Sequence, residues 1–232
     1  SRWISDWEML AERYAGNPTV IGADLSNEPH NGNWGGGGPN DWPAAAERAA
    51  NAIHAKNSDW LILVEGVGQY NGSSYWWGGA LAGVRDRPVV LNTSNKLVYS
   101  PHAYPYSIFV QQWFDTPDFP QNLFSVWQDN WGFIYEEGIA PDLLGEFGSR
   151  FEDAKDVQWM AQMQKYLTGD LNGDGVRDVP ADKQPIKWTW WSWNPNSGDT
   201  GGILQDDWRS VHQNKIDLLQ PAMFPLLPVG EP

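Results

Sequence analysis

Short apolar runs alternate with longer amphipathic segments along this chain, and no other feature constrains the fold as strongly. The first amphipathic segment has apolar residues at helical spacing from Ile4 to Tyr14 and ends at Gly16, a residue type common at helix C-termini. The runs between such segments are continuously apolar, as in buried strands. This order predicts an α/β fold with a parallel sheet and helical crossovers. We expect helices over 4–16, 41–57, 124–138 and 156–169, and strands over 19–28, 60–66, 96–104, 140–148 and 185–194.

Polar or aromatic side chains stand at the end of every predicted strand. The loops at the carboxyl ends of parallel strands converge on one face of a sheet, and ligands bind there. We therefore expect these side chains to form one site. They are Asn27 with Glu28, Glu65, His102 with Tyr104, Glu146, and Trp191 with Trp193.

Two of these carboxylates suggest glycoside hydrolysis. The reaction needs one protonated carboxyl group that donates to the leaving oxygen and one ionised carboxylate that attacks the sugar or activates water. Glu28 and Glu146 are the best candidates, and their opposite protonation states predict a bell-shaped pH dependence of activity. Glu65 is the competing candidate, although it could instead bind a neighbouring cation or cap the next turn.

Composition narrows the class of ligand. The net charge of −14 argues against nucleic acid and anionic membrane surfaces as partners, because both are polyanions that need clustered Lys and Arg. The chain has 16 Trp, and several stand beside Gly, Asn or Ser, where flat aromatic faces suit sugar rings. Packing in the core is the alternative for each of them. The absence of Cys excludes disulfides and thiolate chemistry.

Five segments, taken in order and spacing, resemble glycoside hydrolase family 5, and most closely its bacterial endo-β-1,4-glucanases. They read NPTVIGADLSNEPH, LVEGVGQYNGSSYWWGG, YSPHAY, LLGEFG and WTWWSWNPNSGDTGGIL. The resemblance implies a (β/α)8 TIM barrel, of which this chain supplies strands four to eight, the C-terminal five β/α units, as a single catalytic domain over 1–232. The first three strands have no counterpart here. We therefore expect a missing N-terminal segment or a partner chain to complete the barrel, and Ser1 in place of an initiator Met agrees with a missing upstream piece.

The resemblance also implies residue roles. Glu28 matches the general acid/base and Glu146 the nucleophile of a retaining mechanism, with the two carboxyl groups about 5 Å apart. Asn27 matches the residue that binds the sugar 2-hydroxyl, and His102 and Tyr104 match a pair that lines the cleft and orients the nucleophile. Trp191 matches the stacking platform at the cleavage point, and Trp77 is similar to a second platform on the leaving side.

These roles predict a retaining endo-β-1,4-glucanase that cuts internal bonds of cellulose or a related β-glucan without a catalytic cofactor. Mannanase, xylanase and xyloglucanase are alternatives within the same chemistry. A carbohydrate-binding protein without turnover, derived from a truncated hydrolase, is the alternative of another class. Because a polymer of glucose cannot enter the cell, we expect a secreted, extracellular protein.

A second motif lies between the last predicted helix and strand. Oxygen ligands at alternate positions, with a glycine at the sharp turn, follow the pattern of an EF-hand or dockerin-type calcium loop. The twelfth position is Ala181, where a carboxylate is expected, and a polar surface turn is the alternative. Any calcium in the 170–182 loop would be structural. Its predicted ligands are Asp170, Asn172, Asp174, the backbone of Val176, and Asp178.

Overall fold

The computed structural model describes residues 1–225. Their contacts group into two compact units, one of Ser1–Ala103 with Ser125–Phe147, the other of Tyr104–Phe124 with the described residues from Gly148 onward. A single catalytic domain over 1–232 stays a prediction. None of the helices in the described residues is both long and apolar enough to cross a lipid bilayer.

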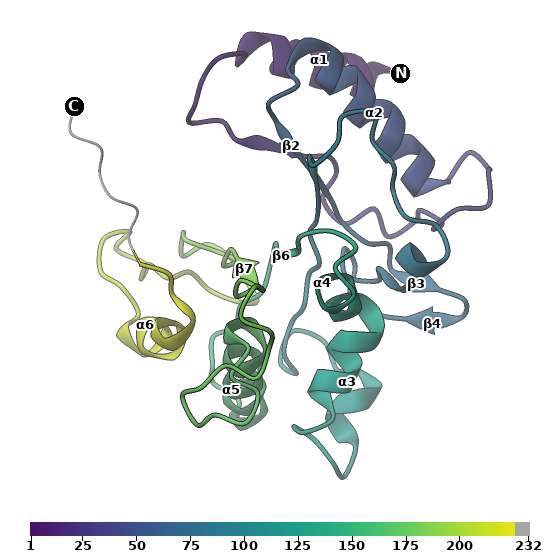
Figure 1. Ribbon diagram of the computed structural model, residues 1–232. Helices are drawn as coiled ribbons and strands as arrows, with labels where there is room; N and C mark the ends of the chain where they lie inside the picture. The colour runs from purple at the N-terminus through teal and green to yellow at the C-terminus, as the bar shows by residue number, and fades with distance from the viewer. Residues whose placement is uncertain (226–232) are drawn as a thin grey trace. The chain divides into compact units, whose positions relative to one another are not determined.

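The first unit contains the predicted parallel sheet. Strands β1 (Gly22–Asp24), β2 (Leu61–Val64) and β5 (Leu97–Tyr99) lie in the order β1-β2-β5, all parallel (Figure 1). Ala23 pairs with Ile62, which pairs with Leu97. The segment with β6 (Leu143–Leu144) continues the parallel arrangement, through bridges from Tyr99 to Asp142 and from His102 to Glu146. The carboxyl ends of four segments therefore meet at one edge.

Two helices pack on this unit, α1 (Arg2–Arg13) and α2 (Trp42–Lys56), and they contact one another (Figure 1). Helix α2 is the crossover from β1 to β2. The side chain of Asp41 caps it by accepting the Ala44 N–H at 2.9 Å, and Pro43 occupies the first turn. Its buried residues include Ala46, Ala49 and Ala50, whose small side chains let the helix pack closely.

The other two connections of the first unit differ from the expectation. Between β2 and β5 the chain forms a hairpin, β3 (Gln69–Tyr70) with β4 (Ser73–Ser74), and a 3-10 helix over Ala82–Arg85. The helix predicted over 124–138 consists of α3 (Leu123–Trp127), a π-helical turn (Gln128–Gly132) and α4 (Phe133–Glu136). The Asn130 amide donates to the Val126 carbonyl oxygen at 2.8 Å and competes with the backbone for that acceptor, which favours the break.

The second unit contains α5 (Ala154–Thr168), β7 (Lys187–Trp188) and α6 (Gln213–Leu219). Helix α5 is capped by Asp153 and ends at Gly169 in the left-handed conformation, close to the predicted bounds. The strand predicted over 185–194 is wrong for most of its length. Beyond β7, Ser192 and Trp193 accept the N–H groups of Ile203 and Leu204 at 2.9 and 3.0 Å, so this stretch belongs to a loop.

Candidate active site

Four of the predicted strand-end residues lie together in the first unit. Glu28 follows β1, Glu65 comes directly after β2, His102 follows β5 and Glu146 follows β6. One ligand atom each from Glu28, His102 and Glu146 lies within 4.8 Å of the others, and in the described part of the chain this is the one such group of three His, Cys, Asp or Glu residues. The parallel order of the strands brings these distant residues together.

His102 stands at the centre of this group, with its side chain 2% exposed. Its Nδ1 lies 3.0 Å from Glu28 Oε1 and 3.4 Å from Glu146 Oε2, and its Nε2 lies 3.4 Å from Glu65 Oε1. Burial alone would lower the pKa of His102, but hydrogen bonds to Glu28 and Glu65 and the charges of Glu65 and Glu146 raise it to about 10. The ring is therefore a cation at neutral pH and pairs with the negative charge of the acidic side chains around it.

Glu65 is the buried carboxyl group of this cluster, with its side chain only 3% exposed, and it contacts both Glu28 and His102. Its Oε2 accepts the backbone N–H of Glu28 at 2.7 Å, while Oε1 faces His102. Gly78, at φ +75°, leaves room for this arrangement, since a Cβ there would lie 2.7 Å from Glu65 Oε2 and 2.9 Å from the His102 ring. Glu65 thus pairs with the positively charged ring of His102, in agreement with the alternative that it binds a neighbouring cationic side chain.

Glu28 has a strained backbone, with φ at 45° in the left-handed region. A non-glycine residue there costs about 1–2 kcal/mol, and such strain is common at functional sites. The bond from its N–H to Glu65 holds this conformation, as does the 2.6 Å bond from the His30 N–H to the Glu28 carbonyl oxygen. The side chains of Glu28 and Glu146 are 24% and 17% exposed, so a ligand can reach both.

Asp24, within β1, is a candidate functional residue that the sequence analysis did not identify. Asp24 as a whole is an exposed residue, but burial around its carboxyl group and the negative charge of Glu65 raise the pKa of Asp24 to about 7. Ser100 Oγ donates to its Oδ2 at 3.3 Å. An acidic residue inside a short apolar strand was the available signal for it.

The predicted sugar-binding residues fall in both units. In the first, Asn27 is exposed beside Glu28, and the 56%-exposed Trp77 stacks on His30 with ring centroids 4.0 Å apart and planes at 16°. In the second, Tyr104 is buried and Trp191 is 46% exposed. That Tyr104 and Trp191 reach the Glu28 carboxylate stays a prediction.

The predicted calcium loop uses its carboxylates locally. Asp170 accepts the N–H groups of Gly173, Asp174 and Gly175 at 2.8–3.1 Å. Asp178 accepts those of Leu171 and Asn172. Within the described residues, the loop's carboxylates are not gathered as those at His102 are. Calcium binding stays a prediction.

Comparison with known proteins finds a matching family model and similar endoglucanases. A family model described as Cellulase (glycosyl hydrolase family 5) matches residues 1–197. An endoglucanase of Paenibacillus polymyxa is 48% identical over 238 residues, an alignment that covers 100% of this chain and 56% of the relative. The major extracellular endoglucanase of Xanthomonas campestris pv. campestris is 39% identical over 229 residues, covering 95% of this chain and 44% of the relative.

Solved structures of similar endoglucanases and endocellulases also superpose on this chain. The catalytic domain of the Xanthomonas campestris pv. campestris major endoglucanase superposes with a TM-score of 0.82 at 39% identity, covering 95% of this chain and 61% of that domain. A cellotetraose complex of an endocellulase from Pyrococcus horikoshii superposes with a TM-score of 0.84 at 35% identity, covering 95% and 62%. These relatives are (β/α)8 barrels, so the expected fold class is confirmed, and the chain spans between 44% and 62% of the length of these relatives.

Proposed function

This chain belongs to the cellulases of glycosyl hydrolase family 5, and from that membership we propose that it is a retaining endo-β-1,4-glucanase that cuts internal bonds of cellulose or a related β-glucan. The spacing of Glu28 and Glu146 carries the proposal. Their nearest ligand oxygens lie within 4.8 Å. Retaining glycosidases hold their carboxyl groups about 5–5.5 Å apart, and inverting enzymes about 6.5–9.5 Å apart.

The two residues divide the chemistry. The Glu146 carboxylate attacks the anomeric carbon while the Glu28 carboxyl group gives its proton to the departing glycosidic oxygen, and a glycosyl ester forms on Glu146. Glu28, now ionised, then takes a proton from water, whose oxygen attacks the same carbon and releases Glu146. The net change adds one water across the bond, and the two carboxyl groups and the water suffice without a cofactor.

His102 has a positioning role in this scheme. Its ring nitrogen lies 3.0 Å from Glu28 Oε1 and 3.4 Å from Glu146 Oε2, so it holds the two carboxyl groups in place relative to one another. We assign Asn27 to the sugar 2-hydroxyl, Trp191 and Trp77 to stacking, and Tyr104 to the cleft, as the sequence predicted.

The names of the relatives support the substrate and the location. They are endoglucanases, and the Xanthomonas protein is named as extracellular. We therefore propose a β-glucan substrate and a secreted protein. Because the chain spans 56% of the Paenibacillus relative, we also propose that a further segment or a partner chain completes the barrel of the active protein.

Trapping the covalent intermediate tests the proposal. A 2-deoxy-2-fluoro cellobiosyl fluoride should add one glycosyl group to the protein, and peptide mass spectrometry should place it on Glu146. Release of reducing ends from carboxymethylcellulose should accompany it. Binding of β-glucan without labelling or release would instead support the carbohydrate-binding alternative.

A structural calcium ion in the 170–182 loop is a separate proposal. Its support is the alternation of Asp170, Asn172, Asp174, the Val176 backbone and Asp178 along the sequence. Isothermal titration calorimetry with calcium on the chelator-treated protein tests it, and magnesium serves as the control.

A further inference from the structure

The backbone carbonyl oxygen of Leu25, which precedes Glu28 on the same segment, is bound by two side chains of helix α1. Trp3 Nε1 donates to this oxygen at 3.1 Å and Trp7 Nε1 donates to it at 3.2 Å. Residues spaced as Trp3 and Trp7 are lie on one face of a helix, so α1 presents both indoles to the same atom. The chemistry described above gives these two tryptophans no role.

Leu25 marks the point at which the pairing of β1 with β2 ends. The Leu61 N–H donates to the Ile21 carbonyl oxygen at 3.0 Å, and further along the Leu25 N–H donates to β2 at 3.2 Å. In the same register, the next bond would run from the Glu65 N–H to the Leu25 carbonyl oxygen. In the described residues the indoles of α1 bond to that oxygen in place of Glu65. They supply the partner that the carbonyl group of a buried residue needs when the ladder ends.

The carbonyl group at the end of β2 is bound in the same way. Trp42 Nε1, from the first turn of α2, donates to the Glu65 carbonyl oxygen at 2.8 Å. The rings of Trp42 and Trp3 lie 6.1 Å apart between centroids. The side chain of Glu65 accepts the Glu28 N–H at 2.7 Å. Indoles from α1 and α2 therefore hold the two backbone segments that this bond joins.

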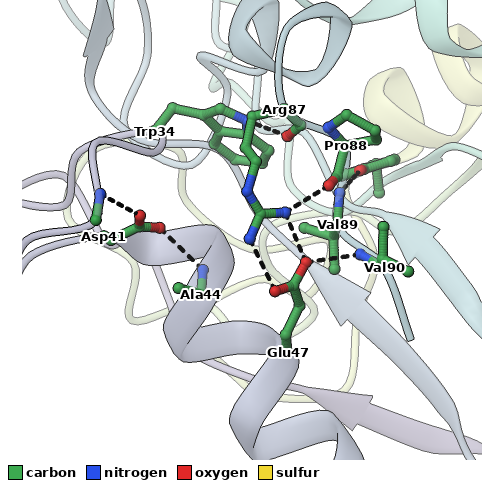
Figure 2. A network of polar contacts seen from close by, with 10 residues as sticks. Trp34, Asp41, Ala44, Glu47, Arg87, Pro88, Val89 and Val90 are labelled. Carbon is green, nitrogen blue, oxygen red and sulfur yellow. Dashed lines mark hydrogen bonds and ion pairs between the residues drawn. The ribbon is translucent and has the colours of Figure 1, made fainter. Parts of the chain in front are cut away.

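Helix α2 has anchors of its own that do not involve α1 (Figure 2). Its Glu47 forms a bidentate pair with the Arg87 guanidinium at 2.6 and 2.8 Å and accepts the Val90 N–H at 2.8 Å. Trp34 Nε1 donates to the Arg87 carbonyl oxygen at 2.8 Å. A bidentate pair restricts both side chains, so α2 should keep Trp42 in place when the indoles of α1 are removed. The effect of α1 can therefore be measured separately.

We propose that Trp3 and Trp7 are positioning residues for Glu28, the proposed proton donor. The inference rests on the proposed function and extends it to helix α1. After Leu25 the backbone leaves the sheet and reaches the left-handed conformation of Glu28, at φ 45°. The two indole bonds fix the start of this turn, and the bond from the Glu28 N–H fixes its end. A displacement of a catalytic group by about 1 Å can lower a rate by roughly 100-fold.

Two substrates that differ in their need for a proton test the assignment in the full-length protein. The sugar that departs from cellotetraose is a strongly basic alkoxide unless it is protonated, whereas dinitrophenyl β-cellobioside releases a phenolate that is stable without a proton. Trp3→Phe and Trp7→Phe keep an aromatic ring and remove the N–H donor. We expect the ratio of kcat/KM for cellotetraose to that for the dinitrophenyl substrate to fall about ten- to 100-fold in the double variant. Each single variant retains one donor, so its ratio should fall about three- to tenfold.

Trp60→Phe is the matched control. Trp60 is a buried tryptophan of the same unit, directly before β2, and in the described residues its Nε1 has no hydrogen-bond partner. Its substitution removes the same atoms without removing a hydrogen bond, so its ratio should equal that of the unmodified protein. An unchanged ratio in the double variant, with or without a common loss on both substrates, would overturn the proposal. If thermal unfolding shows that the double variant does not fold, the single variants decide in the same way.

The ring of His102 separates this inference from the proposed function, because its Nδ1 lies 3.0 Å from Glu28 Oε1. NMR of protein with nitrogen-labelled histidine follows this ring without turnover. If the His102 resonances shift in the double variant and not in Trp60→Phe, the indoles position Glu28 even where neither substrate is cleaved, and only the proposed function fails. If these resonances do not shift, the positioning role is refuted even where hydrolysis is confirmed.

Discussion

Two acidic clusters of this molecule carry similar residues and use them in opposite ways. At His102, the carboxylates of Glu28, Glu65 and Glu146 come from three different strand ends and surround one buried ring. In the 170–178 loop, Asp170 and Asp178 accept N–H groups no more than seven residues away. The first cluster gathers acidic groups around the His102 ring. The carboxylates of the second cluster accept hydrogen bonds from the backbone of their own loop.

The difference shows what kind of acidic pattern indicates catalysis. Carboxylates that are far apart in sequence and converge in space repel one another strongly. Such an arrangement persists where a cation offsets the repulsion, and it is common where catalysis requires the charges. Carboxylates that satisfy adjacent N–H groups form a stable turn and need no further role. Each of the following experiments asks whether the two clusters differ in the way described.

The largest effect should come from the proposed catalytic pair, Glu28 and Glu146. In the proposed mechanism, Glu28→Gln and Glu146→Gln each remove a group that transfers a proton or attacks carbon, so kcat on carboxymethylcellulose should fall by about 100- to 10,000-fold or more. Thermal unfolding checks that both variants fold. Polymer binding should persist in Glu28→Gln, and an active Glu146→Gln variant would contradict the mechanism.

Glu65→Gln should have the next largest effect. An amide in place of the carboxylate turns a donor toward the Glu28 N–H or toward His102, a loss of about 1–3 kcal/mol, or roughly 5- to 150-fold in kcat. Because Glu65 helps raise the pKa of His102, that pKa should also fall. The imidazole resonances followed by NMR against pH measure the shift. Glu12→Gln, in an exposed ion pair with Lys56, is the control and should change neither quantity.

Stability should decrease at alkaline pH because of His102. Its pKa is raised to about 10 in the folded protein and is about 6.5 in the unfolded chain, so the folded state holds the proton more tightly. The stabilisation is fully present below pH 6.5 and is lost as the pH rises through 10. Urea unfolding at several pH values should show the free energy of unfolding falling over this window. A His102→Asn variant should show a flatter dependence, and equal slopes would refute the assignment.

The smallest effect belongs to the loop. Asp170→Ala frees three N–H groups that water can reach, a loss comparable with that of a helix cap, about 0.5–2 kcal/mol. The midpoint of thermal unfolding should fall by a few degrees. Asp206→Ala, at an exposed aspartate of the same unit, is the control. If Asp170→Ala lowered kcat as much as Glu65→Gln, the contrast between the clusters would be wrong.

The sequence was informative about the order of elements and the positions of the strand-end residues. The apolar runs ending in Glu28, Glu65, His102 and Glu146 lie in parallel, as their alternation with helices predicts. The motif resemblance predicted the family. These features depend on local patterns and on the geometry of parallel sheets, which a sequence expresses directly.

Other features depend on tertiary contacts and were not predictable. The support of Glu28 by Glu65 spans 37 residues and requires a glycine at position 78 to make room. The predicted strands were longer than the observed ones, because the residues beyond each paired segment turn away and form loops. The ion pair of Arg87 with Glu47 likewise joins two residues that lie 40 positions apart in the chain and belong to no motif.

The wide separation of the residues around His102 has a consequence for how the protein acquires its activity. His102 is 74 residues from Glu28 in the chain, so the cluster exists only after the strands have assembled. Contacts of such long range form slowly, because the closure of long loops must precede them. Hydrolytic activity should therefore return late during refolding, after the helices, and its recovery rate would report the final assembly step of the sheet.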